Sequence, residues 1–251
     1  MKEIKKNKPE NNEFHISGNL RKAASLLFAI LSSLTLLTLG LTGCKSNESV
    51  SSSSLSGLDL VSTIAYDLNI IVDYDNEKIE ATCGLTVENR FQHPVSRLPL
   101  VLYRLMRVAS VEDEQGRKLD FSQQVVSYED WDKFQANFIE VNLKSAIQPR
   151  ARATLKIAYG GYLSGYTETG LSYVRDSINR DFTIIRPDCL AYPQVGVPSW
   201  SANRVAGLQA FDYIIRVTVP ASFTVANGGR LIERLTSEKQ VTYVYKNILP
   251  A

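Results

Sequence analysis

The chain has 251 residues, of which 44% are hydrophobic and 22% charged, so its composition is that of a globular protein with one large or two small domains. The formal net charge of +2 arises at the N-terminus. Residues 1–43 hold six Lys or Arg and three acids, which leaves 22 of the 28 basic and 23 of the 26 acidic side chains elsewhere. Nucleic-acid binding depends on clustered basic side chains, and none cluster after residue 44, so we exclude that function.

The N-terminal segment has the pattern of a secretory signal. Its first 22 residues are polar and net positive, and residues 23–41 carry no charged side chain. A positive flank, an apolar stretch and small residues before a cleavage site are typical of signal peptides. The sequence Leu41-Thr42-Gly43-Cys44 resembles the lipobox of bacterial lipoproteins, in which the cysteine receives a diacylglyceryl group and becomes the first residue. The resemblance implies a signal peptide over residues 1–43 and fatty acyl chains such as palmitate on Cys44.

Two further expectations concern the region around Cys44. Several acyl chains on this residue would anchor the protein stably to the bacterial cell membrane, with its bulk outside the cytoplasm. The alternative is an uncleaved membrane anchor, because about 20 apolar residues can span a bilayer as a helix. Residues 44–60 are rich in serine and too polar to bury much apolar area, so we predict a flexible tether there.

Cys83 and Cys189 are the other two cysteines of the chain. Outside the cytoplasm they can form a disulfide if their Cα atoms lie close enough, and the sequence does not show that distance. Two separate buried thiols are the alternative.

From residue 61 onward the sequence has the character of β-strands. Apolar residues alternate with polar or small ones, most clearly from Ile79 to Val87, and this period of two is typical of a strand with one buried face. We therefore predict an all-β fold over residues 61–251. It would be an antiparallel sandwich or saddle of sheets that follows the signal helix and the serine-rich linker. The predicted strands are residues 64–73, 77–89, 96–103, 106–113, 118–126, 137–143, 153–159, 182–186, 211–219, 230–235 and 240–246.

Residues 160–207 form a different kind of segment, rich in Gly, Pro, Tyr and Ser, with long gaps between its apolar runs. Long irregular segments in compact domains are often functional or interfacial, although an ordered surface loop is an equally simple interpretation. The aromatic residues around this segment could form a binding face, or they could cover the edge of the core or the docking surface of another domain. These residues are Tyr159, Tyr162, Tyr166, Tyr173, Tyr192 and Trp200.

The order of these elements resembles the N-terminal β domain of the aminopeptidase N family of zinc metallopeptidases. Residues 66–70 and 79–84 resemble the first hairpin of that family, and residues 155–163 (LKIAYGGYL) resemble its recurrent L-x-I-x-Y-x-G-x-L strand. Residues 219–228 (VPASFTVANG) resemble a run that begins with Val-Pro and ends with Asn-Gly. The resemblance covers nearly all of residues 64–251, and it implies a domain that carries, orients or completes a catalytic domain.

The catalytic zinc site of that family has no counterpart in this sequence. The site needs a His-Glu-x-x-His helix and a later Glu, whereas the two histidines here are His15, before the predicted cleavage point, and His93, in a turn. Residues 192–198 stand where the family has P-C-x-D-E-P, and they hold no acidic pair. Residues 183–186 lack the Gln or Glu that helps to hold a substrate's amino group. The resemblance therefore implies a missing catalytic domain, zinc only in that domain, and no enzyme activity in this chain alone.

Other catalytic arrangements find little support in the sequence. A Ser-His-Asp triad or an activated cysteine would need His93 as its base, and no G-x-S-x-G motif is present. The acidic runs Glu112-Asp113-Glu114 and Glu129-Asp130 could supply a glycosidase pair, but such runs are usually solvated turns.

Two hypotheses for the function follow. The first is a membrane-anchored extracytoplasmic lipoprotein whose aminopeptidase N-like domain belongs to a larger metallopeptidase-like protein. The second is a free-standing surface-binding or scaffolding lipoprotein that uses residues 160–207 to hold a peptide, a glycan or a protein partner.

The lipobox makes a direct prediction. Replacement Cys44→Ala should abolish labelling with a radioactive fatty acid and release the protein from the membrane fraction, because the acylated thiol is removed. Labelling of cells that express either form, followed by fractionation, measures both effects. An unlabelled wild-type protein of unprocessed size would contradict the prediction and favour an uncleaved anchor.

Overall fold

The computed structural model describes residues 58–166, 177–206 and 210–250, without the side chains of residues 204–206. The predicted signal peptide 1–43, the lipobox residues Leu41, Thr42 and Gly43, and Cys44 lie outside these residues. The predicted tether does so as well, apart from its last three residues. Leu58 and Leu60 pack against the core of the domain. In the part of the chain that is described, no helix is long and apolar enough to cross a membrane.

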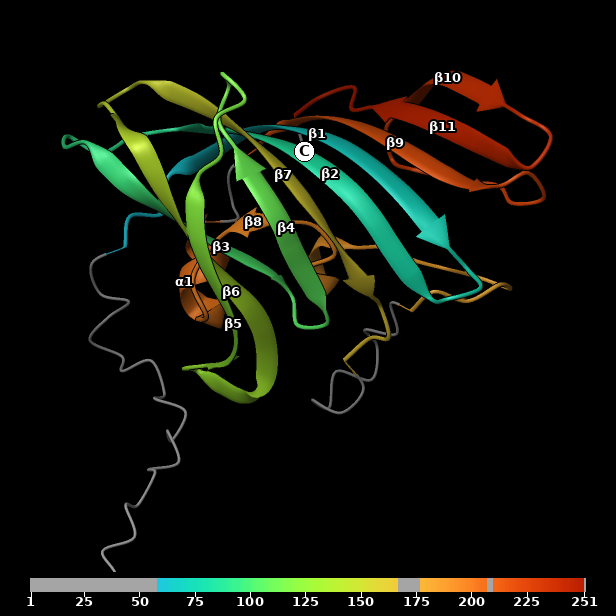
Figure 1. The fold of residues 1–251 in the computed structure, drawn as a ribbon, viewed down its shortest axis with the longest axis horizontal. Helices are drawn as coiled ribbons and strands as arrows, with labels where there is room; N and C mark the ends of the chain where they lie inside the picture. Colours follow the sequence, from blue (N-terminus) through green and yellow to red (C-terminus); the bar gives the residue numbers. More distant parts are fainter. Residues whose placement is uncertain (1–57, 167–176, 207–209, 251) are drawn as a thin grey trace, which may run out of the picture. The chain divides into compact units, whose positions relative to one another are not determined.

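Two β-sheets form the domain, as the sequence predicts. Seven strands make the larger sheet in the order β10-β11-β9-β1-β2-β7-β4, and four make the smaller one in the order β5-β6-β3-β8 (Figure 1). The strands are β1 (Ser62–Asp73), β2 (Lys78–Glu88), β3 (Val95–Tyr103), β4 (Met106–Glu112), β5 (Asp120–Tyr128), β6 (Trp131–Ile147), β7 (Arg152–Tyr162), β8 (Gln194–Val195), β9 (Asp212–Pro220), β10 (Arg230–Thr236) and β11 (Gln240–Lys246).

The pairing is antiparallel between neighbouring strands with one exception. β1 pairs in parallel with β9, from Ala65 opposite Asp212 to Ile71 opposite Thr218. A parallel pair needs a crossover connection, and here that connection contains β2 to β8 and the irregular segment. The predicted all-β fold of antiparallel sheets is confirmed, and β1 with β9 is the one parallel pair among the described strands.

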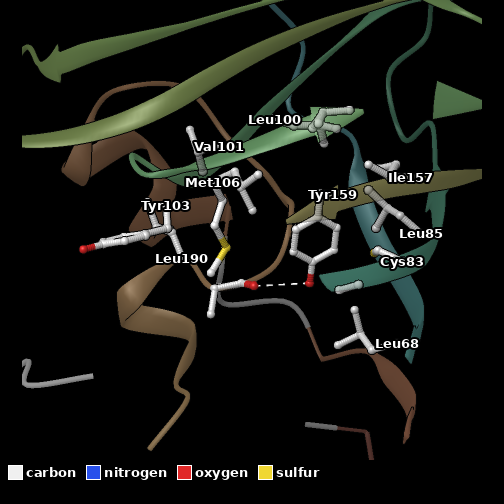
Figure 2. Close-up of a cluster of buried hydrophobic side chains, with 14 of the residues drawn as sticks. Leu68, Cys83, Leu85, Leu100, Val101, Tyr103, Met106, Ile157, Tyr159 and Leu190 are labelled. Atoms are coloured by element: carbon white, nitrogen blue, oxygen red, sulfur yellow. Dashed lines mark hydrogen bonds between the residues drawn. The ribbon is translucent and has the colours of Figure 1, made fainter. Parts of the chain in front are cut away.

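One hydrophobic core lies between the two sheets. Along β1 the side chains of Tyr66, Leu68, Ile70 and Val72 are buried while their neighbours Asp67, Asn69 and Ile71 are exposed, and β2 alternates in the same way. β3 has no such alternation, because residues 98–103 are all buried. Figure 2 shows the meeting of the sheets, where Leu100 of β3 lies near Leu85, Ile157 and Tyr159 of the larger sheet.

Side chains of the smaller sheet complete the edge strand β4 of the larger one. Gln123 of β5 donates from Nε2 to the Val108 carbonyl at 2.8 Å and accepts the Val108 amide at Oε1 at 3.0 Å. Asn137 of β6 donates to the Met106 carbonyl at 3.0 Å. An open strand edge exposes unpaired backbone groups that can pair with another chain, so these amides both join the sheets and close the edge.

The irregular region contains the main errors of the sequence-based prediction. Residues 182–186, predicted as a strand, pair with no strand, because the chain there leaves a tight turn at Asn179. Two short elements were not predicted, namely β8 and the seven-residue helix α1 (Trp200–Ala206). A short 3-10 turn, Pro187–Cys189, separates them from the turn at Asn179. Residues 160–162 belong to β7, and outside these elements the other described residues up to 207 are irregular, as predicted.

Gly161 permits a close approach of backbones at the end of β7. Its φ of +150° is unfavourable for other residues, and an added Cβ would run into the Leu105 carbonyl oxygen and lie 2.7 Å from Met106 Cα. Gly161→Ala should therefore destabilise the domain by about 2 kcal/mol or more, through backbone strain and steric overlap.

Denaturant unfolding of the two proteins measures this change in the free energy of unfolding. Gly228→Ala is the matched control, because a Cβ there meets no atom within 4 Å. The control should stay within about 0.5 kcal/mol of the wild type. Equal stabilities for Gly161→Ala and Gly228→Ala would contradict the account of β7.

Candidate functional site

The irregular segment between β7 and β9 is attached to the larger sheet by tyrosine hydroxyl groups. Tyr66 of β1 donates to the Pro193 carbonyl and Tyr159 of β7 to the Ala191 carbonyl, each at 3.2 Å; the dashed line in Figure 2 marks the second bond. Tyr192 lies between these carbonyls and packs edge-on against Tyr66, with ring centroids 5.2 Å apart. Tyr66 and Tyr159 thus fix the position of residues 191–193, which overlap the start of residues 192–198, the stretch expected to correspond to the P-C-x-D-E-P segment.

Burial keeps these hydroxyl groups protonated. Loss of solvation raises the pKa of Tyr66 and of Tyr159 well above its usual range, and the neighbouring Cys83 thiol raises it further. Burial likewise raises the pKa of Tyr192. The groups therefore act as hydrogen-bond donors throughout the physiological pH range, and they are not poised for acid–base catalysis.

A second aromatic cluster holds the start of the segment against the smaller sheet. Tyr103 of β3 donates to the Gly165 carbonyl at 2.7 Å, and Tyr166 donates to the Gln135 carbonyl at 3.1 Å. The ring of Tyr166 stacks on Phe134 of β6, with centroids 4.4 Å apart. Aromatic pairs of this kind add to the free energy of burial, so this end of the segment is also firmly packed.

The predicted aromatic residues therefore belong mainly to the core. Tyr159 and Tyr166 are fully buried, and Tyr192 and Trp200 are half-buried. Tyr162 alone among those described is exposed, at 49% of its surface. Tyr173 lies outside the described residues. The interpretation that these aromatics cover the core accounts for their positions better than a single aromatic binding face.

Asp130, one of the predicted acidic candidates, stabilises the start of α1. Its carboxylate accepts hydrogen bonds from the amides of Trp200 at 2.7 Å and Ser201 at 2.8 Å, and from the hydroxyls of Ser199 and Ser201. Partial burial would raise the pKa of this carboxyl, but the bonds from Ser201 and Trp200 outweigh it and lower the pKa to about 2. A carboxylate at a helix N-terminus satisfies free amide groups, so Asp130 has a structural role here.

Asp113 and Glu114, two more of the acidic candidates, are engaged in the turn that follows β4. Asp113 accepts from the Arg117 side chain at 2.7 Å and from the Gln115 and Arg117 amides. Glu114 accepts the Thr154 amide at 2.7 Å. These contacts brace the turn between β4 and β5 against β7, and they show no pair of carboxylates facing a common site.

His93 and the cysteines likewise have structural surroundings. His93 Nε2 lies 2.9 Å from Asp59 Oδ2, and the ring stacks on Phe91, so the histidine joins the β2–β3 turn to the start of the folded chain. Cys83 and Cys189 are both buried, and the structure holds them as thiols rather than as a disulfide. Burial raises the pKa of Cys83 far above its usual range, which makes this thiol a poor nucleophile.

The described residues offer no site that fits a catalytic zinc ion. Nowhere among them do three or more His, Cys, Asp or Glu side chains gather as metal ligands. One surface depression, of about 220 Å³, lies beside Glu114, Leu119 and Ala151. Another, of about 430 Å³, lies over Thr82 and Ala158 on the outer face of the larger sheet. Neither depression is lined by a histidine or a cysteine.

Comparison with known proteins adds a result at the level of the fold. No protein-family model and no curated protein sequence matches this chain. The crystal structure of the M1 zinc metallopeptidase from Deinococcus radiodurans is 22% identical, with a TM-score of 0.53 over 76% of this chain. Mutants of an M1 zinc metallopeptidase bound to a Tyr-Ser-Ala substrate or to L-tryptophan give TM-scores of 0.54, at 20% and 22% identity. The fold resembles that of M1 zinc metallopeptidases.

This likeness agrees with the fold that the aminopeptidase N resemblance implied, and at such low identity it concerns the fold alone. The chain matches only 39% or 40% of the length of these solved structures. More than half of each M1 metallopeptidase therefore has no counterpart in this chain.

The contribution of the Asp130 carboxylate to stability, as the cap of α1, can be tested by mutation and by varying the pH. Asp130→Ala should lower the free energy of unfolding by about 1 kcal/mol, because the amides of Trp200 and Ser201 lose their acceptor. A carboxyl whose pKa is lowered in the folded state stabilises the fold above its unfolded pKa near ~4. The difference in the free energy of unfolding between the wild type and Asp130→Ala should therefore be complete at neutral pH. It should shrink as the pH falls from about 4 towards 2.

Urea unfolding of both proteins between pH 2 and pH 7 measures that difference. Glu129→Gln serves as the matched control, because the contact of Glu129 with Pro198 uses its backbone amide. A destabilisation by Asp130→Ala that is the same at every pH would show that the carboxylate charge does not contribute.

Proposed function

We propose that this protein is a membrane-anchored extracytoplasmic lipoprotein whose β domain is a non-catalytic, aminopeptidase N-like N-terminal domain of a larger metallopeptidase-like assembly. Cys44 would carry the lipid, and the serine-rich residues 44–60 would hold the domain away from the bacterial membrane. Any zinc and the peptide chemistry would belong to a separate catalytic domain. The role of the β domain would be to bind and orient that domain.

The observation that carries the proposal is the match of this chain to a part of solved M1 metallopeptidases, over 76% of its own length but only 39% or 40% of theirs. A domain that corresponds to part of a longer enzyme is expected to work with the remainder. The surroundings of His93, Asp113 and Asp130 agree with this proposal, because their side chains maintain turns and a helix cap.

The packing of the irregular segment also supports a docking role. Residues 191–193 and Gly165 are held by Tyr66, Tyr159 and Tyr103, so these described parts of the segment have a defined position before any partner arrives. A preorganised surface loses less entropy on binding than a flexible one. The second candidate, a free-standing scaffolding lipoprotein, would use the same preorganised segment to hold a peptide, glycan or protein.

The two candidates predict different sizes for the native protein. An antibody raised against residues 58–250 should detect, in membranes of the source cells, either a polypeptide well above 28.0 kDa or a stable complex that contains a second, metallopeptidase-like chain. Denaturing and native electrophoresis of the same membranes distinguish these two forms. A polypeptide at or below 28.0 kDa that migrates alone would contradict the proposal and favour the free-standing lipoprotein.

A further inference from the structure

The pair Asn227-Gly228 lies in the connection between β9 and β10 (Figure 1). Asn227 is the only asparagine of the chain that is followed by a glycine. A glycine has no Cβ, so its backbone nitrogen is less hindered than that of any other residue. Such a nitrogen can attack the carboxamide carbon of the asparagine before it, which is the first step of deamidation.

The fold leaves this pair open to solvent. Asn227 and Gly228 are both exposed. A Cβ added at Gly228 would meet no atom within 4 Å, so no other part of the domain covers that side of the glycine. Water can therefore reach the pair, exchange protons with it and carry away a leaving group.

Two donors hold the carboxamide oxygen of Asn227. The Tyr213 hydroxyl on β9 and the Gly229 amide each donate to Asn227 Oδ1 at 2.8 Å. A backbone amide can only donate, so the atom that it faces is the oxygen of the carboxamide and not the nitrogen. Among the described residues none accepts a hydrogen bond from Asn227 Nδ2. The side chain is thus bound through its oxygen, and its nitrogen is free to leave.

These bonds also favour the attack itself. Asn227 Oδ1 reaches the amide two residues further on, so the side chain is folded towards the Gly228 nitrogen that lies between them. When that nitrogen attacks Cγ, negative charge develops on Oδ1. Donors that already point at such an oxygen stabilise the charge without further rearrangement.

Two other asparagines show what is particular to Asn227. Asn89 and Asn179 also accept the amide two residues further on, both at 2.8 Å. Each is followed by an arginine, whose side chain hinders the backbone nitrogen. Asn89 is also buried, and its Nδ2 donates to the carbonyls of His93 and Ile147 at 2.8 Å. Neither residue combines an open nitrogen with a held oxygen and a free leaving group.

We infer that Asn227 is a site of spontaneous deamidation in this protein. Hydroxide removes the proton from the Gly228 amide, and the nitrogen forms a bond to Cγ of Asn227. The bond from Cγ to Nδ2 breaks, and Nδ2 takes a proton from water and leaves as ammonia, so that a succinimide ring remains. Water opens the ring at either carbonyl. The net reaction consumes one water, releases one ammonia and leaves aspartate or isoaspartate at position 227.

The structure accommodates the two products differently. Aspartate keeps the length of the backbone, and its carboxylate can accept the same bonds from Tyr213 and Gly229. Isoaspartate adds one carbon to the backbone just before β10. Gly229 is packed closely there, because an added Cβ would lie 2.5 Å from the Lys246 carbonyl oxygen. The longer backbone therefore displaces the start of β10 from β11, which is the only strand that β10 pairs with in the described sheet.

Ageing of the purified full chain tests the site. The protein is incubated in detergent at neutral pH, in water labelled with heavy oxygen. Peptides are then mapped by mass spectrometry with electron-transfer fragmentation, which distinguishes aspartate from isoaspartate. We expect heavy oxygen to enter position 227 as both products, while Asn89 and Asn179 keep their amides. The reaction needs only water, so the result is independent of the proposed function.

Two variants test the roles of the neighbouring groups. Gly228→Ala should slow deamidation by about tenfold or more, because a methyl group hinders the attacking nitrogen. The fold has room for that methyl group, so the variant should stay folded. Tyr213→Phe should slow the reaction by about threefold or more, because Oδ1 loses one of its two donors. In urea, where the chain is unfolded, the wild type and Tyr213→Phe should react at the same rate.

Four results would overturn these assignments. If Asn227 stays intact while a synthetic peptide of residues 223–233 deamidates, the fold protects the site. Equal labelling at Asn179 would mean that exposure alone decides. A Gly228→Ala rate equal to that of the wild type would exclude the Gly228 nitrogen as the nucleophile. A Tyr213→Phe rate equal to or above that of the wild type would contradict the stabilising role of the hydroxyl.

Discussion

Hydrogen bonds from buried tyrosine hydroxyls to backbone carbonyls hold the irregular parts of this domain in place. Tyr66 and Tyr159 fix residues 191–193, and Tyr103 fixes Gly165. Tyr243 and Tyr245 of β11 bind the carbonyls of Phe223 and Val225 at 3.2 and 2.6 Å in the same way. A loop that crosses a sheet has no strand partner for its carbonyl groups, and an unpaired buried carbonyl is costly. A tyrosine solves this problem because its ring fills the core while its hydroxyl reaches the loop.

Hydrogen bonds from side chains to the backbone also join the two sheets. Gln123 binds both backbone groups of Val108, and Asn137 binds Met106, so polar side chains of one sheet complete the edge of the other. The remaining edge, β10, is fully exposed along its length and has a bulge between Leu231 and Glu233. Charged residues and bulges on an edge strand discourage pairing with another chain. The two edges of the larger sheet are thus protected by different means.

The regular part of the fold could be predicted from the sequence, because period-two alternation is a local property. β2 buries Ile79, Cys83 and Val87 as expected, and β11 begins and ends at the predicted residues. Residues 182–186 were wrongly predicted as a strand, because Phe, Thr and Ile favour strands even where no partner strand exists. Helix α1 is too short to show helical periodicity, and its capping residue, Asp130, lies 70 positions before Trp200 in the sequence. The hydrogen bonds of the tyrosines could not be predicted either, because their partners are far apart in the sequence. Tyr66 and Pro193, for example, are 127 positions apart.

The parallel pair of β1 and β9 has a consequence for how the chain reaches this fold. β1 can form its hairpin with β2 early, but its other neighbour begins at Asp212, after the whole smaller sheet has been made. Contacts between residues this far apart form slowly, because a long loop must close first. Until then the backbone groups along the open edge of β1 stay available for pairing with other nascent chains. A chaperone that shields this strand edge during the interval should therefore raise the yield of folded protein.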